Sequence, residues 1–159
     1  MIVLAVAAVA FVTMEGVTYL AHRFVMHGVG WLLHRSHHES SLARFEANDA
    51  YPIGFGALTV AVMALGFQLP MSALVAATVG VTMYGAAYLF VHDVYIHGRL
   101  GRLPRVEVLE RLRSAHLVHH LYKGEPFGML LPYIPRSLRD RSAANTWDGD
   151  GGGVELVQL

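Results

Sequence analysis

The sequence predicts an all-α integral membrane protein, a bundle of about three spanning helices with further helices at the cytoplasmic membrane surface. Its 159 residues are 54% hydrophobic and 15% charged, against ~45–50% and ~25% in an average soluble domain. Two stretches are almost free of charge: residues 1–20 contain only Glu15, and residues 53–91 contain no Asp, Glu, Lys, Arg or His. The length allows one domain.

The first span is expected within Met1–Leu20. A cleaved signal peptide is the alternative, but this stretch lacks a basic start and continues into His22 and His27 without a turn signal. A retained spanning helix is therefore the preferred interpretation.

The second charge-free stretch predicts a tight helical hairpin. A spanning helix needs ~20 mainly apolar residues, so the 39 residues from 53 to 91 suit two spans, Ile53–Leu69 and Met71–Val91. Pro70 lies near the middle and marks the turn. A soluble bundle with a buried hairpin is the alternative, and so long an uncharged run argues against it.

The positions of the basic residues predict the orientation. None precedes the first span or lies in the hairpin turn, and cytoplasmic loops carry an excess of Lys and Arg. The N-terminus and the hairpin tip are thus expected outside the inner (cytoplasmic) membrane, and the rest of the chain in the cytoplasm. The twelve basic residues are Arg23, Arg35, Arg44, Arg99, Arg102, Arg105, Arg111, Arg113, Lys123, Arg136, Arg139 and Arg141.

The C-terminal part predicts structure at the membrane surface. Arg105–Tyr122 has apolar residues and histidines at helical spacing, which is typical of an amphipathic interfacial helix. Pro126–Pro135 is too short and too rich in proline to span. We expect a membrane-embedded domain over residues 1–144 and a flexible glycine-rich tail over residues 145–159.

All ten histidines fall into four short clusters. Two are H-x4-H pairs and two are H-x2-H-H triplets, in the order pair, triplet, pair, triplet. They are His22 and His27; His34, His37 and His38; His92 and His97; and His116, His119 and His120.

The spacing of the triplets suits chelation of a metal ion. On a helix the three imidazoles fall within ~100° of arc and share one face. The paired histidines lie ~140° apart on an ideal helix, so they either serve different ions or sit where a helix ends or bulges.

The histidines predict a metal centre. Protonated imidazoles in such clusters would repel one another, whereas imidazole that ligates a metal is neutral. Ten ligands suit two ions, and the absence of cysteine excludes thiolate sites. Imidazole binds iron, copper, zinc and nickel, so the residues alone do not choose the metal. The net charge is zero, which gives no argument for a nucleic-acid partner.

The location of the clusters favours chemistry on a lipophilic molecule. They lie at the cytoplasmic ends of the predicted spans, whereas a transporter would place its ligands near the midplane of the membrane. A haem protein would need only two well-placed axial histidines. A metal transporter or haem protein is therefore the weaker, non-enzymatic alternative.

The order of the clusters resembles the fatty acid hydroxylase/sterol desaturase superfamily of membrane di-iron oxygenases. Neighbouring stretches are more specifically similar to its carotenoid branch, the bacterial β-carotene hydroxylases (carotenoid 3-hydroxylases). The similar stretches run from about residue 15 to residue 132, and they are residues 21–28, 34–39, 45–49, 84–93, 97–99, 115–120 and 126–128.

The resemblance implies an O2-dependent, non-haem di-iron monooxygenase that hydroxylates carbon 3 of β-ionone rings and converts β-carotene to zeaxanthin through cryptoxanthin. It implies two iron ions, which zinc can replace in isolated protein, with O2 as cosubstrate, a carotenoid taken from the bilayer, and an electron donor such as ferredoxin. The basic residues from Arg99 to Arg113 would suit either an acidic donor or lipid headgroups. A fatty acid or sterol hydroxylase or desaturase of the same superfamily is the alternative.

Four carboxylates are candidates for supporting the ligands, and no catalytic residue beyond the ten histidines is expected. Glu15 lies seven residues before His22 in an otherwise apolar span, where an ionisable group needs a partner. Glu39, Asp49 and Asp93 adjoin the clusters and are expected to orient imidazole N–H groups.

Overall fold

The computed structural model describes residues 1–39 and 45–145, with side chains described up to Arg141. These residues form helices and connecting segments and contain no strand. The chain divides into two compact units, Met1–Leu89 and Phe90–Leu159. The tail expected from residue 145 lies outside the described residues, except for Asn145, which ends the last helix. In chain order the elements are α1 (Ile2–Leu20), η1 (Ala21–Val29), α2 (Trp31–His38), η2 (Ala47–Asp49), α3 (Ala50–Gln68), α4 (Ser72–Leu89), η3 (Phe90–Ile96), α5 (Glu107–Tyr122) and α6 (Arg136–Asn145).

Three helical stretches are long and apolar enough to cross a membrane, which confirms the predicted number of spans. They are Ile2–Val29, Ala47–Gln68 and Ser72–Ile96. The first and third continue further than the sequence predicted, because the backbone stays helical through His22 and His27 in the first and through His92 in the third. His22, His27 and His92 therefore lie inside the candidate spans.

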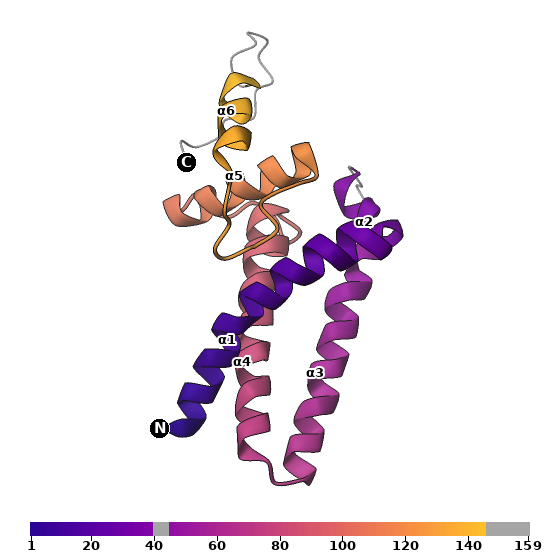
Figure 1. Ribbon diagram of the computed structural model, residues 1–159, viewed down its shortest axis with the longest axis vertical. Coiled ribbons are helices and arrows are strands. Elements are labelled where there is room, and N and C mark those ends of the chain that lie inside the picture. The colour runs from indigo at the N-terminus through magenta and orange to yellow at the C-terminus, as the bar shows by residue number, and fades with distance from the viewer. Residues whose placement is uncertain (40–44, 146–159) are drawn as a thin grey trace. The chain divides into compact units, whose positions relative to one another are not determined.

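In the first unit, α3 and α4 form the predicted antiparallel hairpin, and α1 packs along α4 (Figure 1). The hairpin turns at residues 69–71, where the Met71 amide donates to the Gly66 carbonyl over 2.9 Å. α1 and α4 approach closely at Gly80, where an added Cβ would lie 2.1 Å from the carbonyl oxygen of Ala7. Glycine is thus required at this crossing.

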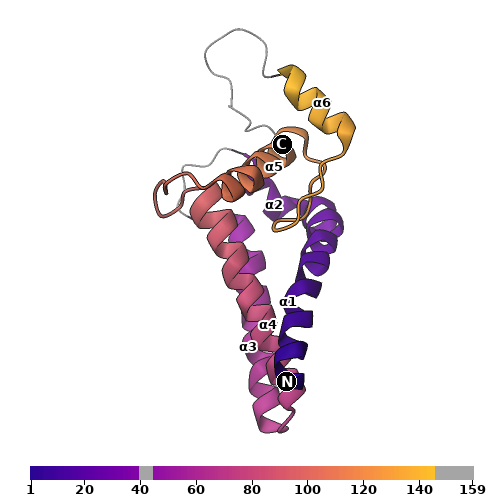
Figure 2. The same cartoon turned by 90° about the vertical axis from the view of Figure 1, so that its left-hand side faces the viewer.

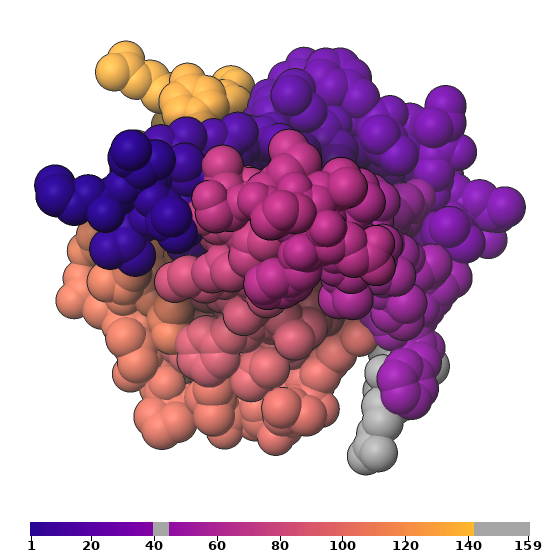
Figure 3. All heavy atoms as spheres, turned by 90° about the horizontal axis from the view of Figure 1, so that it is seen from below, coloured from indigo at the N-terminus to yellow at the C-terminus, as the bar shows by residue number. Residues whose placement is uncertain are grey.

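The outer faces of these helices are apolar. Leu4, Val9 and Phe67 are 76%, 66% and 67% exposed, which suits side chains that face lipid. Figure 3 looks onto the hairpin turn, with the N-terminal end of α1 beside it.

In the second unit, η3 is joined to α5 by residues 97–106, and α5 is followed by an irregular segment and then α6. Ala115 and Val118 of α5 form a small core with Ile134. The Tyr95 hydroxyl donates to Glu110 Oε1 over 2.6 Å and accepts from the Val106 amide over 3.0 Å. These bonds hold the start of α5 against η3.

Candidate metal centre

His22 and His27 lie on the π-helical segment η1, and His92 lies on the π-helical segment η3, which ends directly before His97. A π-helix closes its hydrogen bonds between residues i and i+5, so side chains five residues apart lie one turn apart. The His97 amide donates to the His92 carbonyl in this way over 3.0 Å. The ring centroids of His22 and His27 are 5.1 Å apart, and those of His92 and His97 are 4.6 Å apart. The H-x4-H spacing could mean either that the two histidines serve different ions or that they sit where a helix ends or bulges. The structure shows a π-helical bulge.

In the first unit, the pair and the triplet face one another because the chain reverses after η1. Gly28 has non-helical backbone angles, and the Gly30 carbonyl accepts a hydrogen bond from the Tyr51 hydroxyl over 2.7 Å. A Cβ at Gly30 would lie 1.9 Å from that hydroxyl oxygen. The reversal lets α2 direct its histidines toward those of η1.

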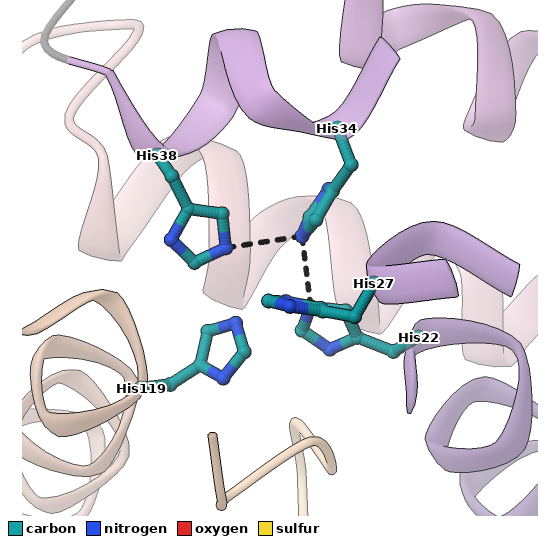
Figure 4. Close-up of side chains that lie close together, drawn as sticks. All are labelled: His22, His27, His34, His38 and His119. Carbon is teal, nitrogen blue, oxygen red and sulfur yellow. Dashed lines mark hydrogen bonds between the residues drawn. The ribbon is translucent and has the colours of Figure 1, made fainter. Parts of the chain in front are cut away.

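Four imidazoles of the first unit converge. His22, His27, His34 and His38 each offer a ring nitrogen, and these nitrogens all lie within 4.8 Å of one another (Figure 4). His34 is central: its Nε2 lies 3.1 Å from Nε2 of His22 and 3.2 Å from Nε2 of His38. A set of four such nitrogens has the chemistry and the spacing of a metal site.

Two residues of the first unit accept hydrogen bonds from the Nδ1 atoms of imidazole rings. His34 Nδ1 donates to Asn48 Oδ1 over 2.7 Å, and His37 Nδ1 donates to Glu46 Oε2 over 3.1 Å. With the hydrogen on Nδ1, the Nε2 atom keeps its lone pair for a metal ion. Acceptors of this kind fix the tautomer and the orientation of ligating histidines.

The second unit repeats this arrangement. Nitrogens of His92, His97 and His116 lie within 4.8 Å of one another, and His116 is the central ring. Its Nε2 lies 3.1 Å from Nε2 of His97 and 2.9 Å from Nε2 of His120. Each unit thus brings together both histidines of its pair with the first and third histidines of its triplet.

In the second unit, too, Nδ1 atoms of imidazole rings donate to acceptors. His92 Nδ1 donates to Asp93 Oδ2 over 3.3 Å, and Arg99 Nε contacts Asp93 Oδ1 over 3.1 Å. His119 Nδ1 donates to the carbonyl oxygen of Gly124, which α5 brings close by ending in the left-handed conformation of Lys123 (φ 53°). Asp93 therefore accepts a hydrogen bond from an imidazole, as expected from its position next to His92.

Burial keeps the central ring of the second unit neutral. Burial first, and then the neighbouring imidazoles of His92, His120, His97 and His119, hold the pKa of His116 well below its usual value. A neutral imidazole is the form that binds metal.

The other predicted supporting residues are placed as follows. Glu15 Oε2 accepts a hydrogen bond of 2.6 Å from the buried hydroxyl of Tyr84 on α4, which supplies the partner that a carboxylate in a span needs. Glu39 is exposed and pairs with Arg35 over 3.3 Å. Asp49 Oδ2 accepts from the Glu46 amide over 3.0 Å and so caps η2.

Glu46, Asn48 and Tyr84 were not among the supporting residues expected from the sequence. Glu46 and Asn48 lie in the stretch 45–49 that carried the family resemblance, next to Asp49, which was selected because it is charged. An amide that accepts from a histidine has no charge or spacing signature of its own. Tyr84 lies 69 residues from Glu15, and only the packing of α1 on α4 reveals the pair.

The fold and the two imidazole clusters define a class, the integral membrane proteins whose histidines are arranged to hold metal ions. Within it, the chain belongs to the fatty acid hydroxylase family, whose sequence model matches residues 7–139. Membership makes it an oxygenase of a metal-dependent family.

Curated relatives carry a more specific name. The chain is 38% identical to "Beta-carotene hydroxylase" of Pantoea ananas over 92% of each chain. It is 34% identical to "Beta-carotene hydroxylase" of Pseudescherichia vulneris, over 84% of this chain and 79% of the relative. It is 40% identical to "Beta-carotene 3-hydroxylase, chloroplastic" of Haematococcus lacustris, over 74% of this chain and 39% of the relative. No solved structure gives a significant match.

Proposed function

We propose that the protein hydroxylates carbon 3 of the β-ionone rings of carotenoids and converts β-carotene to zeaxanthin through cryptoxanthin. Each hydroxylation consumes one O2, two electrons and two protons and releases one water. The observation that carries the proposal is a double four-imidazole arrangement in a chain 38% identical, over 92% of its length, to a β-carotene hydroxylase.

The ten histidines are the proposed ligands of two iron ions, which supply the O2-activating chemistry when bound. His22, His27, His34 and His38 would hold metal in the first unit, and the second unit repeats the set with His92, His97, His116 and His120. The middle histidine of each triplet, His37 or His119, is oriented by its own acceptor and completes the ligand set. Asn48, Glu46, Asp93 and the Gly124 carbonyl keep the rings oriented.

The substrate is proposed to enter from the bilayer. β-Carotene is almost entirely hydrocarbon, so transfer through water would forfeit the hydrophobic free energy that keeps it in lipid. An aromatic ring flanks each histidine cluster. The ring centroid of Trp31 lies 5.3 Å from that of His27 and 5.5 Å from that of His38. The ring centroid of Phe127 lies 5.4 Å from that of His119. We propose that these rings contact the end groups of the carotenoid.

The proposed topology places the N-terminus and the hairpin tip outside the inner membrane and the histidines at its cytoplasmic side. A cytoplasmic electron donor such as ferredoxin would then reach the site. The cysteine-free chain allows single cysteines at the exposed positions Gln68 and Ser137. An impermeant thiol reagent should label Gln68→Cys in intact cells and Ser137→Cys only after lysis. The opposite labelling pattern would contradict this topology.

Product analysis tests the reaction itself. Expression in β-carotene-accumulating cells should yield cryptoxanthin and zeaxanthin, while the lipids of ordinary cells stay unchanged. His34→Ala and His116→Ala, which remove the central rings, are the inactive controls. The second candidate, hydroxylation or desaturation of a fatty acid or sterol, is favoured by the name of the matching family; altered lipids without polar carotenoids would establish it and refute the first.

We propose that residues 1–144 form the functional hydroxylase domain. All ten histidines lie between residues 22 and 120, and the family match ends at residue 139. A chain that ends at Ala144 should keep wild-type conversion per inserted molecule. A loss of conversion in a correctly inserted truncation would show that the tail contributes.

A further inference from the structure

Three consecutive triplets of the same design join η3 to α5. They are Gly98-Arg99-Leu100, Gly101-Arg102-Leu103 and Pro104-Arg105-Val106. Each triplet has a conformationally special residue, then an arginine, then an apolar residue. We call residues 98–106 the triplet loop; it leaves the end of η3 and leads into α5 (Figure 2).

Both ends of the triplet loop are tied to the end of a candidate membrane span. The span Ser72–Ile96 ends two residues before Gly98. At the other end, the Val106 amide donates to the Tyr95 hydroxyl over 3.0 Å, and Tyr95 belongs to the last turn of that span. A segment held at both ends to the terminus of a spanning helix lies at the membrane surface.

The beginning of the triplet loop is a defined turn. Gly98 and Gly101 have φ of 63° and 100°, values that favour glycine, and the Gly101 amide donates to the Gly98 carbonyl over 2.8 Å. The turn directs Arg99 inward to Asp93, which it contacts over 3.1 Å. Arg99 therefore pairs with the carboxylate that accepts a hydrogen bond from His92 in the second histidine cluster.

The remaining basic and apolar side chains of the loop face outward. Leu100, Leu103 and Val106 are 81%, 42% and 50% exposed. Arg102 and Arg105 are exposed, and neither forms an ion pair with another residue in the described part of the chain. The loop thus presents apolar and cationic groups in alternation at the level where the helix leaves the membrane.

We infer that the triplet loop binds the anionic headgroups of the bilayer surface. Arg102 and Arg105 contact lipid phosphates, and Leu100, Leu103 and Val106 enter the boundary between headgroups and acyl chains. Interleaved cationic and apolar groups are what an anionic lipid surface binds. A soluble acidic protein would account for the arginines, but it would not explain why both ends of the loop are held at the membrane surface.

A spin label on the full-length, naturally cysteine-free chain tests this inference. Leu103→Cys is labelled with a nitroxide, and the protein is placed in nanodiscs of phosphatidylcholine, with or without phosphatidylglycerol. The label should be accessible to O2 and protected from a water-soluble nickel chelate when phosphatidylglycerol is present. Adding Arg102→Gln and Arg105→Gln should lower the ratio of immersed to aqueous label roughly 30-fold, because each arginine is attracted to an anionic surface by about 1 kcal/mol.

The matched control is the pair Arg136→Gln and Arg139→Gln on α6, two exposed arginines at the same spacing, which should leave the ratio unchanged. Three outcomes would overturn the inference. One is a water-accessible label in both membranes. Another is equal immersion without phosphatidylglycerol. The third is protection of the label in lipid-free detergent by an added ferredoxin, which would identify a protein-docking surface.

Discussion

Replacing Asn48 by Ala tests whether hydrogen bonds behind the histidines tune metal binding. In the structure Asn48 Oδ1 accepts from His34 Nδ1 over 2.7 Å, and His34 is the ring whose Nε2 lies 3.1 and 3.2 Å from those of His22 and His38. Without the acceptor, the ring loses its fixed tautomer and the buried Nδ1–H group loses this partner. Partners of this kind typically contribute 10- to 100-fold to metal affinity, or about 1.4 to 2.7 kcal/mol.

The assay is competitive metal binding on purified protein. Metal is removed anaerobically with a chelator, Fe²⁺ is returned, and a chromophoric chelator reports the affinity. Asn48→Ala should bind metal 10- to 100-fold more weakly, whereas Asn48→Asp, which keeps an acceptor in place, should recover most of the loss. Arg35→Gln is the control, because Arg35 is next to His34 but its side chain is 55% exposed. Wild-type affinity in Asn48→Ala, or equal loss in both Asn48 variants, would refute the reasoning.

Three further predictions follow from the ligand set and from the α1–α4 contact. Single alanine variants of His37, His38, His119 and His120 should abolish carotenoid conversion, measured by chromatography, while immunoblots show normal insertion; substantial activity in any two argues against their role as ligands. Purified protein should contain about two metal ions per chain by elemental analysis, and recovery of one or none after anaerobic reconstitution contradicts the double site. Zinc in place of iron would still count as occupancy, because Zn²⁺ generally binds more tightly than Fe²⁺. Tyr84→Phe should lower the free energy of unfolding in bicelles by about 1.5 to 3 kcal/mol, the range for a hydrogen bond to a charged group. The same substitution should cost less in a Glu15→Gln background, and equal losses in the two backgrounds would mean that the pair is not coupled.

The sequence was sufficient to predict the helical layout because charge and proline act locally. A run of 39 residues without a charged side chain has few stable environments other than lipid, and Pro70 marks the turn between its two helices. The observed hairpin, Ala50–Gln68 and Ser72–Leu89, agrees with the expected Ile53–Leu69 and Met71–Val91 within a few residues. The expected interfacial helix Arg105–Tyr122 begins at Glu107 instead, where Tyr95 holds the preceding amide.

The partners of the polar groups could not be predicted, because they depend on contacts between distant segments. Asn48 lies 14 residues from His34, and Tyr84 lies 69 residues from Glu15. Charge was the criterion for choosing supporting residues, and it led correctly to Asp93, which contacts its sequence neighbour His92. It also led to Asp49, which the structure shows capping the Glu46 amide, and to Glu39, which forms a surface pair with Arg35.

The spacing of the H-x4-H pairs did not by itself predict the backbone conformation around them. On an α-helix two such imidazoles point about 140° apart, and the sequence left open whether they serve separate ions or mark a bulge. The π-helical segments place both rings on one side, 5.1 and 4.6 Å apart by centroid. π-Helices are rare and concentrate at functional sites, so each segment needs a compensating interaction. Metal binding would supply one, because the free energy of binding to a site that exists only in the folded chain is folding free energy. In this chain each pair of histidines five residues apart lies at the end of an apolar span, and a second histidine cluster follows within reach, as His34 follows His27 and His116 follows His97.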